Sequence, residues 1–373
     1  MNFIRNPIID IMTHSLFAPF QMGSFSLTNR IVMAPLTRRH AENPELTAND
    51  LIAEHYRQRA TAGLIISEGS QISEQAYGYT HSPGCHTKAQ IEAWKKVTRA
   101  VHEAGGHIFL QLWHVGPFSH PLLQPGQRSP LSASAVKPEG QVLTPHGRLP
   151  YETSRAMSRE DIRQTIRDFA AAALSATEAG FDGVEVHGAH AYLIDQFIMD
   201  GTNHRTDEYG GSLENRARLL FELLEAISEK IPLERTGLRL SPGRMKSGMA
   251  DSKAEKTYGY IVERLNDYPL AYLHLSEMME PEERLLHPQK SIVPFYRKLF
   301  RGTLISCGGH SRASALRMID EQEADMIAFG KLFISNPDLP RRLSENLPLA
   351  GWDNDTFYHG GSRGYNDYPP AGI

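Results

Sequence analysis

The sequence contains only two cysteines, Cys85 and Cys307, among 373 residues. Two cysteines cannot build a disulfide framework, a four-cysteine zinc site or a cysteine-ligated iron–sulfur cluster. No apolar run reaches the roughly 18 residues that a membrane-spanning helix needs. Residues 1–14 are interrupted by Arg5, Pro7 and Asp10, a poor pattern for a secretion signal, and we expect an extended segment there. These absences favour a cytoplasmic protein without a membrane partner.

Charge of one sign is also missing, because 39 basic residues stand against 43 acidic ones and give a formal charge of −4. A nucleic-acid-binding protein needs a basic footprint, so no nucleic-acid partner is expected. With 40% hydrophobic and 22% charged residues, the chain can bury a core and is not disordered. The length suits one α/β barrel with inserted loops, and we expect residues 1–373 to form a single domain.

Short apolar runs alternate with longer amphipathic segments along the chain. The predicted strands are Ile31–Pro35, Leu64–Glu68, His107–Trp113, Gly183–His187, Thr236–Ser241, Ala271–Ser276, Thr303–Cys307 and Met326–Phe329. Their near-continuous apolar character is typical of parallel strands that are buried on both faces. The predicted helices are Asp50–Ala62, Ile91–His102, a helix that Ser158 caps, Glu214–Lys230, Ala254–Asn266, Val293–Phe300, Ser311–Glu321 and Pro337–Glu345.

This alternation predicts a closed (β/α)₈ barrel, the TIM-barrel fold. A doubly wound open sheet is the alternative, and it is disfavoured because no G-x-G-x-x-G motif follows the first strand. Two long segments, Gly116–Tyr151 and Met278–Gln289, interrupt the alternation after the third and sixth strands. Both would lie on the carboxyl-terminal face of a barrel, where long loops usually shape an active site.

Polar residues gather where the predicted strands end, which is where barrel enzymes carry their catalytic groups. Together with the tryptophan, cysteine and glycines beside them, the residues at these ends are Thr37, Glu68, Gln111, Trp113, His114, His187, His190, Arg239, Ser276, Glu277, Cys307, Gly308, Gly309, Gly330 and Lys331. The glycines and Lys331 follow strands seven and eight, where barrels often bind a phosphate against open backbone and a helix N-terminus. Two ordinary helix-start turns explain the same residues equally well.

His187 and His190 form an H-x-x-H pattern just past the fourth strand. Two imidazoles can bind a metal, but a zinc site needs a third protein ligand, and no H-E-x-x-H motif is present. They can instead donate hydrogen bonds to one carbonyl oxygen and polarise it. Tyr192, two residues on, is either packing or a general acid. Arg239 in a buried strand calls for an anionic ligand or a structural ion pair.

At these residues the chain resembles the Old Yellow Enzyme family of FMN-dependent ene-reductases. The ordered motifs are N-R-I-V-M-A-P-L-T-R (29–38), Y-R-Q-R-A (56–60), G-L-I-I-S-E-G (63–69), Q-L-W-H (111–114), G-F-D-G-V-E-V-H-G-A-H-A-Y-L (180–193), R-T-D-E-Y-G-G-S-L-E-N-R-A-R (205–218) and A-F-G-K (328–331). The similarity runs from Leu16 to Pro369 and therefore covers nearly the whole chain.

The resemblance implies a non-covalent FMN, NAD(P)H as reductant and an α,β-unsaturated carbonyl or nitro compound as small-molecule substrate. It implies that Thr37, Pro35, Gly69, Gln111 and Arg239 contact the flavin ring, and that Gly308, Gly309, Gly330 and Lys331 hold its phosphate. His187 and His190 would bind the substrate oxygen, and Tyr192 would protonate the α-carbon. Trp113, Tyr79 and Tyr358 would line the substrate pocket.

The chain departs from the family pattern at a few positions. Lys331 replaces a common arginine, Pro117 replaces the arginine of V-G-R, and the Met278–Gln289 loop lacks a tryptophan that some relatives carry. Three other functions compete with an ene-reductase. They are a metal-dependent barrel hydrolase that uses the histidines, a flavin barrel dedicated to one biosynthetic reduction or isomerisation, and a redox-sensing flavin binder. A monomer and a homo-oligomer both suit the sequence.

Overall fold

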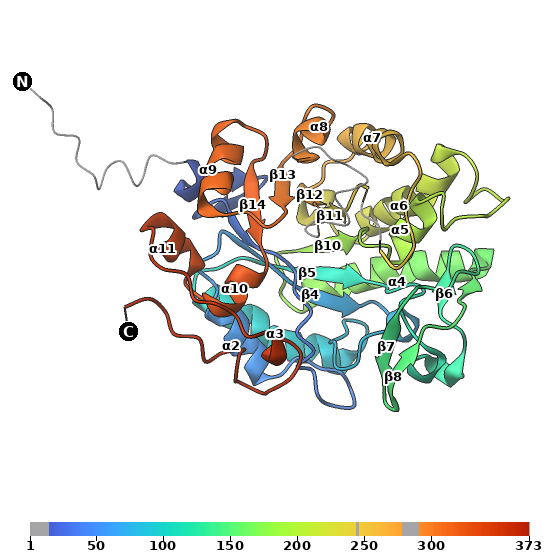
Figure 1. Ribbon diagram of the computed structural model, residues 1–373, viewed down its shortest axis with the longest axis horizontal. Helices are drawn as coiled ribbons and strands as arrows, with labels where there is room; N and C mark the ends of the chain where they lie inside the picture. The colour runs from blue at the N-terminus through green and yellow to red at the C-terminus, as the bar shows by residue number, and fades with distance from the viewer. Residues whose placement is uncertain (1–14, 244–245, 278–290, 373) are drawn as a thin grey trace, which may run out of the picture.

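The computed structural model describes residues 15–243, 246–277 and 291–372. Eight parallel strands close into one barrel, and the predicted barrel is thereby confirmed over the open sheet (Figure 1). In barrel order the strands are β3 (Ile31–Met33), β4 (Leu64–Gln71), β5 (Ile108–Trp113), β10 (Gly183–His187), β11 (Thr236–Leu240), β12 (Tyr272–Ser276), β13 (Leu304–Cys307) and β14 (Met326–Phe329). Pairing of β14 with β3 closes the ring.

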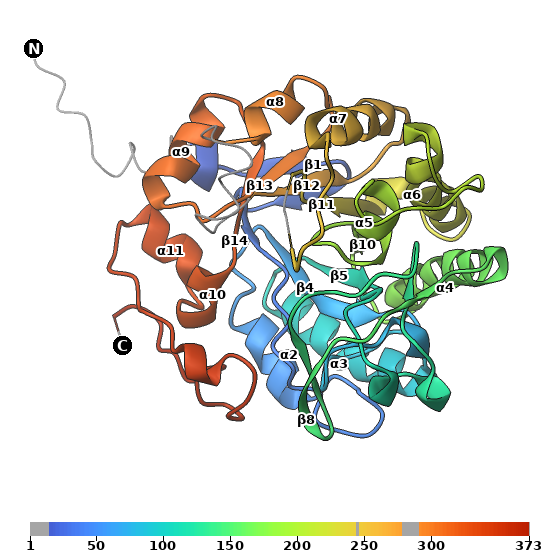
Figure 2. The same ribbon diagram turned by 45° about the vertical axis from the view of Figure 1, so that its right-hand side comes forward.

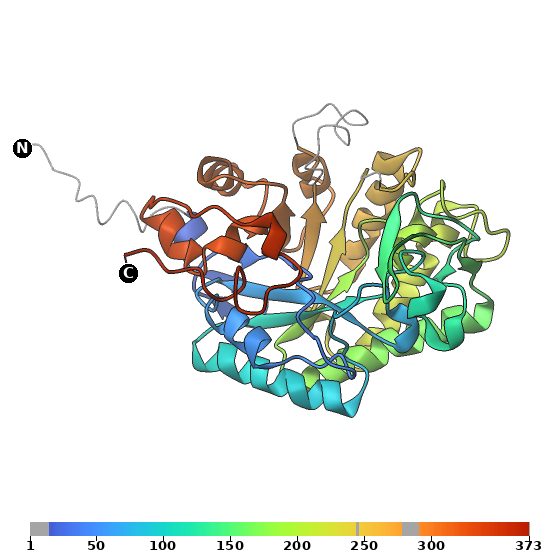
Figure 3. The ribbon, with the colours of Figure 1, turned by 60° about the horizontal axis from the view of Figure 1, so that its bottom comes forward.

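Helices surround the barrel, as Figure 2 shows. They are α2 (Asp50–Arg57), α3 (Lys88–Glu103), α4 (Arg159–Glu178), α5 (Leu193–Ile198), α6 (Leu213–Ser228), α7 (Ala254–Arg264), α8 (Val293–Arg297), α9 (Arg312–Asp320), α10 (Lys331–Ser335) and α11 (Leu339–Ser344). Figure 3 shows α3 (cyan) and α4 (green) outside the strands. Side chains of Thr87 and Ser158 cap these two helices in capping boxes. Within the described residues, no helix is long and apolar enough to cross a membrane.

Several short elements were not predicted from the sequence. The hairpin β1 (Phe20–Met22) and β2 (Phe25–Leu27) precedes the barrel, and the insertion after β5 holds the hairpin β7 (Gln141–Thr144) and β8 (Gly147–Pro150). Two further two-residue strands, β6 (Leu131–Ser132) and β9 (Arg155–Ala156), pair in parallel. Met22 and Leu27 join the core cluster inside the barrel, so the first hairpin closes its amino-terminal end.

Alternate residues of each strand face the barrel interior, and their character changes along the barrel axis. Near the amino-terminal end the interior is apolar and includes Val32, Leu64, Phe109, Ile305 and Met326. Towards the carboxyl ends the inner positions become polar. These polar positions are Gln111, Glu185, Arg239, His274 and Ser276, all buried. The barrel interior is therefore apolar near the amino-terminal ends of the strands and polar near their carboxyl ends, a region called here the mouth of the barrel.

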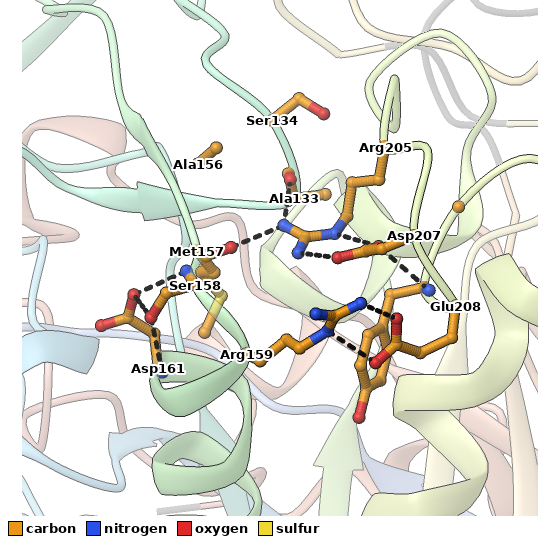
Figure 4. Close-up of polar contacts among 12 residues, drawn as sticks. Ala133, Ser134, Ala156, Met157, Ser158, Arg159, Asp161, Arg205, Asp207 and Glu208 are labelled. Atoms are coloured by element: carbon orange, nitrogen blue, oxygen red, sulfur yellow. Dashed lines mark hydrogen bonds and ion pairs between the residues drawn. The ribbon is translucent and has the colours of Figure 1, made fainter.

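The R-T-D-E-Y-G-G motif has a structural role. The Arg205 guanidinium pairs with Asp207 at 2.6 Å and donates to the carbonyls of Ala133 and Met157 at 3.0 and 2.6 Å (Figure 4). It thereby ties the segment before α6 to the insertion after β5. The neighbouring Arg159–Glu208 pair, also drawn in Figure 4, lies at the surface with both side chains exposed.

The C-terminal segment, red in Figure 1, packs against α2, where the Asn366 side-chain amide donates to the Leu51 carbonyl at 2.8 Å. The Tyr365 ring stacks on His55 with centroids 3.9 Å apart, and the Arg38 guanidinium donates to the Gly364 carbonyl at 2.8 Å. Beneath them, Glu68 is fully buried, and one of its oxygens accepts from the Arg38 amide at 3.3 Å. Burial raises the pKa of Glu68 to about 7.

Replacing Arg205 with methionine should destabilise the fold by about 3 kcal/mol, because Asp207 and two carbonyls lose their buried cationic partner. The matched change Arg159→Met removes a solvent-exposed pair and should leave the unfolding midpoint within error of the parent. Urea unfolding of the two variants provides the comparison. Equal midpoints would show that the Arg205 contacts do not stabilise the fold.

Glu68→Gln should raise stability at neutral pH and lose this advantage in acid. The folded pKa of about 7 lies above the ordinary value of 4.5, so the fold prefers the protonated carboxyl. The contribution of Glu68 to the free energy of unfolding therefore falls as pH rises from about 4.5 to about 7, and stays constant above that. Thermal unfolding across this range measures the effect, with Glu103→Gln on the exposed end of α3 as control. Parallel pH curves for parent and Glu68→Gln would contradict it.

Candidate active site

The predicted site residues lie on one face because the carboxyl ends of all eight strands point the same way. Thr37 and Pro35 follow β3, which ends at Met33 and not at Pro35 as predicted. Gly69 lies within β4, which continues to Gln71, and is registered against Gln111 on β5. A side chain at Gly69 would meet the Trp113 ring at 2.6 Å, so only glycine fits there.

The turn after β10 is strained. His190 and Ala191 both adopt the left-handed region, with φ of +60° and +59°, which costs free energy for residues other than glycine. The His190 amide donates to the Ser241 hydroxyl at 2.7 Å, and the Ala191 amide donates to the Asp195 carboxylate at 2.8 Å. These two bonds hold the turn that sets the positions of His190 and Tyr192.

The two histidines predicted to bind a substrate oxygen lie side by side at this turn, with ring centroids 5.3 Å apart and nearly perpendicular planes. The Ala189 amide donates to His187 Nδ1 at 3.3 Å, so the proton of a neutral ring lies on Nε2, a hydrogen-bond donor. His190 Nε2 contacts the Ser276 hydroxyl at 2.9 Å. A ligand oxygen would therefore bond to His190 Nδ1, or would replace the Ser276 hydroxyl as the partner of His190 Nε2.

Tyr192 lies in an aromatic enclosure. Its ring meets Trp113, His187 and Phe118 edge to face at centroid distances of 5.0, 5.1 and 5.4 Å. Its hydroxyl is 3.0 Å from the Tyr79 hydroxyl. Tyr79, predicted to contact substrate, is thus directly bonded to the predicted acid. Burial is the main cause that raises the pKa of Tyr79 well above its ordinary value, so this phenol stays protonated at neutral pH.

A hydrogen-bond network inside the barrel orients Gln111. Its Nε2 donates to Glu185 Oε1 at 2.8 Å, and the other Glu185 oxygen lies 2.8 Å from His274 Nδ1. Burial is the largest single influence on His274 and lowers its pKa, but the attraction of Glu185 together with hydrogen bonding to Glu185 and Cys307 raises the pKa of His274 overall. Because Glu185 accepts from the amide nitrogen, the Gln111 carbonyl oxygen is the atom that faces Gly69. This network was not predicted.

Arg239 projects into the same mouth from β11. Its Nη2 donates to the Ser276 hydroxyl at 3.4 Å and to Cys307 Sγ at 3.7 Å. Its Nε is buried and has no hydrogen-bond partner among the described residues. No acidic group of that part of the chain pairs with its guanidinium, so the predicted anionic ligand fits better than an internal ion pair. An electron-rich flavin edge would satisfy Nε and the charge together.

The glycine pairs come together because β13 and β14 are neighbours in the barrel. Gly309 has φ of +68°, where a side chain is strained, and the nearest atom to a side chain at Gly330 would be a Leu36 methyl at 3.5 Å. No side chain caps α10 at Gly330. Lys331 is exposed, and its ammonium lies 5.8 Å from the Trp352 ring centroid. The residues present therefore fit a bound phosphate.

Other predicted features fall at the edge of the site. Tyr358 is 52% exposed on the C-terminal segment, with the Arg39 guanidinium 5.7 Å above its ring, so it lies at the rim. Pro117 is buried in the insertion beside Phe118. The Met278–Gln289 loop lies outside the described residues. Lys246, which no motif indicated, reaches the Tyr192 ring from the loop between β11 and α7.

Comparison with known proteins places this geometry in a family. The sequence model of the NADH:flavin oxidoreductase / NADH oxidase family matches residues 15–350. A structure of morphinone reductase in complex with tetrahydroNAD shares 44% identity over 95% of this chain and 97% of that chain, with a TM-score of 0.88. The Old Yellow Enzyme homologue from Zymomonas mobilis shares 41% over 95% and 99%, with a TM-score of 0.91. In Oryza sativa subsp. japonica, 12-oxophytodienoate reductase 1 is 42% identical over 95% of this chain and 92% of its own length.

A family model that covers most of the chain, together with relatives above 40% identity, confirms the resemblance and sets aside the metal-dependent hydrolase. The chain belongs to the NADH:flavin oxidoreductase / NADH oxidase family, in its Old Yellow Enzyme branch, and is an enzyme that uses non-covalent FMN and NAD(P)H to reduce activated carbon–carbon double bonds.

Proposed function

We propose that the polar mouth of the barrel binds FMN and that His187, His190 and Tyr192 then act on an enone or nitroalkene above it. The observation that carries this proposal is the packing of the Trp113, His187 and Tyr192 rings against one another, close to Arg239. Arg239 is buried, and its Nε has no hydrogen-bond partner within residues 15–243, 246–277 and 291–372. Bound FMN would accept hydride from NAD(P)H and return it to the β-carbon of the substrate. The protein residues supply binding, orientation and a proton.

The flavin ring would lie between Gly69, Gln111 and Arg239. Gln111 would accept from the pyrimidine edge through the oxygen that Glu185 leaves facing Gly69. Arg239 would stabilise the negative charge that reduction places on that edge. Thr37 and Pro35 would contact the ring from the loop after β3. The open backbone at Gly308, Gly309 and Gly330, with Lys331, would hold the phosphate.

The histidines would polarise the substrate oxygen. A hydrogen bond from His187 Nε2 and one from His190 withdraw electrons from the carbonyl or nitro group and make its β-carbon electrophilic. The same bonds orient the substrate, because reacting atoms must approach to roughly 3–3.5 Å. Trp113 and Tyr79 would form the walls of the pocket, and Tyr358 its rim. A dedicated isomerase would need the same groups, but no observation favours it.

Tyr192 would donate its proton to the α-carbon of the substrate. The enclosure of aromatic rings holds its hydroxyl in one place, and Tyr79 is bonded to it at 3.0 Å. The relatives named as reductases of 12-oxophytodienoate and morphinone point to cyclic enones as the substrate class. We further infer a cytoplasmic setting for the enzyme, in line with its two free cysteines.

Tyr192→Phe should separate the two half-reactions, because it removes one oxygen and keeps the ring. Reduction of the bound flavin by NAD(P)H needs no proton from this residue and should keep its rate. Reoxidation by a cyclic enone should slow by roughly 10²–10⁴-fold, the usual contribution of a general acid. A nitroalkene should suffer less, because its nitronate product can leave before protonation. Anaerobic stopped-flow absorbance resolves these steps, with Tyr268→Phe near the amino-terminal end of β12 as control. Unchanged enone reoxidation would refute the role of Tyr192.

The double change His187→Ala with His190→Ala should weaken the binding of a phenol such as 4-chlorophenol while FMN stays bound. Each hydrogen bond to a phenolate oxygen contributes on the order of 1.5–3 kcal/mol. Titration of the flavin absorbance measures affinity, and the bound FMN content shows whether the cofactor site is intact. His102→Ala, exposed on α3, is the matched control. Equal affinity in the parent and the double variant would mean that the histidines do not bind the oxygen.

A further inference from the structure

Lys246 is anchored at the mouth of the barrel by its backbone. It lies in the connection between β11 and α7, where its amide donates to the Met249 carbonyl at 3.0 Å and its carbonyl accepts from the Met249 amide at 2.9 Å. The Glu139 amide, from the insertion after β5, donates to the Ser247 carbonyl at 3.2 Å. Two segments distant in sequence therefore hold this lysine beside the site.

The Lys246 side chain turns inward onto aromatic rings. Its ammonium lies 4.0 Å from the centroid of Tyr192 and 4.2 Å from that of Phe118. Both rings are buried, and Lys246 itself is half-buried. A cation over a ring face is attracted by the ring's negative quadrupole, which explains the packing. One of these two rings is that of Tyr192, the proposed proton donor, so the ammonium can also affect proton transfer.

Proton transfer changes the charge beneath this ammonium. When Tyr192 protonates the α-carbon, its O–H bond breaks, a C–H bond forms, and the electron pair stays on the phenolate. That negative charge spreads into the ring under the Lys246 cation, where a separation of about 4 Å in a poorly solvated site gives a strong attraction. The ammonium attracts the neutral phenol much less strongly than the phenolate. Tyr79, 3.0 Å away, can donate a hydrogen bond to the phenolate oxygen.

We propose that Lys246 is a positioning residue that stabilises the phenolate form of Tyr192 and so makes Tyr192 a stronger acid for the substrate. This inference rests on the proposed function, in which Tyr192 is the proton donor. Lys246 touches neither the proton nor the α-carbon and acts through the Tyr192 ring. Solvent later returns the proton to Tyr192, so the charge cycle closes without a further reactant.

Other ionisable groups surround Tyr192 and would act with Lys246. His187 faces its ring from β10 at 5.1 Å, and Tyr79 bonds its hydroxyl from the segment after β4. Asp195 lies on α5, where burial raises its pKa to about 7 and the Lys246 charge opposes that rise. Among these groups, Lys246 is the one whose side-chain type ordinarily carries a positive charge at neutral pH.

The test compares Lys246→Met with Lys246→Arg, which keeps the charge, and with Lys256→Met on the exposed face of α7. With a neutral cyclic enone, so that no substrate charge is attracted directly, Lys246→Met should slow flavin reoxidation roughly tenfold and move the alkaline limb of its pH profile up by about one unit. Lys246→Arg should restore most of the rate. Flavin reduction by NAD(P)H and nitroalkene turnover should stay at the parent values.

A readout independent of turnover is the ultraviolet tyrosinate titration of the FMN-loaded enzyme, with the Tyr192→Phe variant subtracted. The Tyr192 transition should move to higher pH in Lys246→Met. An unmoved titration and pH profile, or equal slowing of both half-reactions, would overturn the proposal and leave Lys246 as packing. If Tyr192→Phe slows enone reoxidation but Lys246→Met does not, this inference fails while the proposed function stands. If Tyr192→Phe is also without effect, both fail.

Discussion

A closed barrel forces every second side chain of eight strands into one enclosed space, and the rest of this structure depends on how that space is filled. Near the amino-terminal end, apolar side chains and the β1–β2 hairpin fill it completely. Towards the carboxyl ends the strands place Gln111, Glu185, Arg239 and His274 inside. Buried polar and charged groups are costly unless they are paired. The polar groups near the carboxyl ends of the strands therefore have to form hydrogen bonds with one another or with a ligand.

Some of these polar groups bond to one another, and others are left for a ligand. Glu185 and His274 are wholly buried and are paired through His274 Nδ1, and Glu185 also accepts from the Gln111 amide nitrogen. His274 Nε2 has no hydrogen-bond partner among the described residues. The Gln111 oxygen faces Gly69, and Arg239 Nε has no hydrogen-bond partner in the part of the chain that the structure describes. The internal network thus decides which atoms the barrel presents to a cofactor. The strained turn at His190 and Ala191 is held in a similar way by hydrogen bonds to Ser241 and Asp195, so the positions of His190 and Tyr192 also depend on these neighbours.

The sequence predicts the barrel well because buried parallel strands leave long apolar runs, and all eight predicted strands overlap observed ones. The ends of the predicted strands also locate the candidate site, because the carboxyl ends of parallel strands lie on one face of the barrel. The hairpins escape prediction because strands of three or four residues carry too few residues for a periodic pattern. The Glu185–His274 pair joins residues 89 positions apart and exists only in the register of the closed barrel. Lys246 carries no signal because its position depends on loop geometry. Arg205, found by its motif, stabilises the insertion and lies outside the mouth of the barrel.

The departures from the family pattern lie in the loops and the helix start around the site and not on the barrel strands. Among the residues proposed to contact the flavin, Gly69, Gln111 and Arg239 lie on strands, whereas Thr37 and Pro35 lie in the loop after β3. Lys331 is exposed, with its ammonium near Trp352, so in the proposed phosphate cradle the backbone at Gly309 and Gly330 has to provide most of the directed contacts. Pro117 lies in the buried wall next to Phe118, whose ring meets both Tyr192 and Lys246. A change in that wall alters the surroundings of the proposed proton donor, Tyr192, whereas the proposed cofactor contacts on the strands stay the same. Under the proposed function, the strands hold the groups that contact the cofactor, and the insertion after β5 shapes the surroundings of Tyr192.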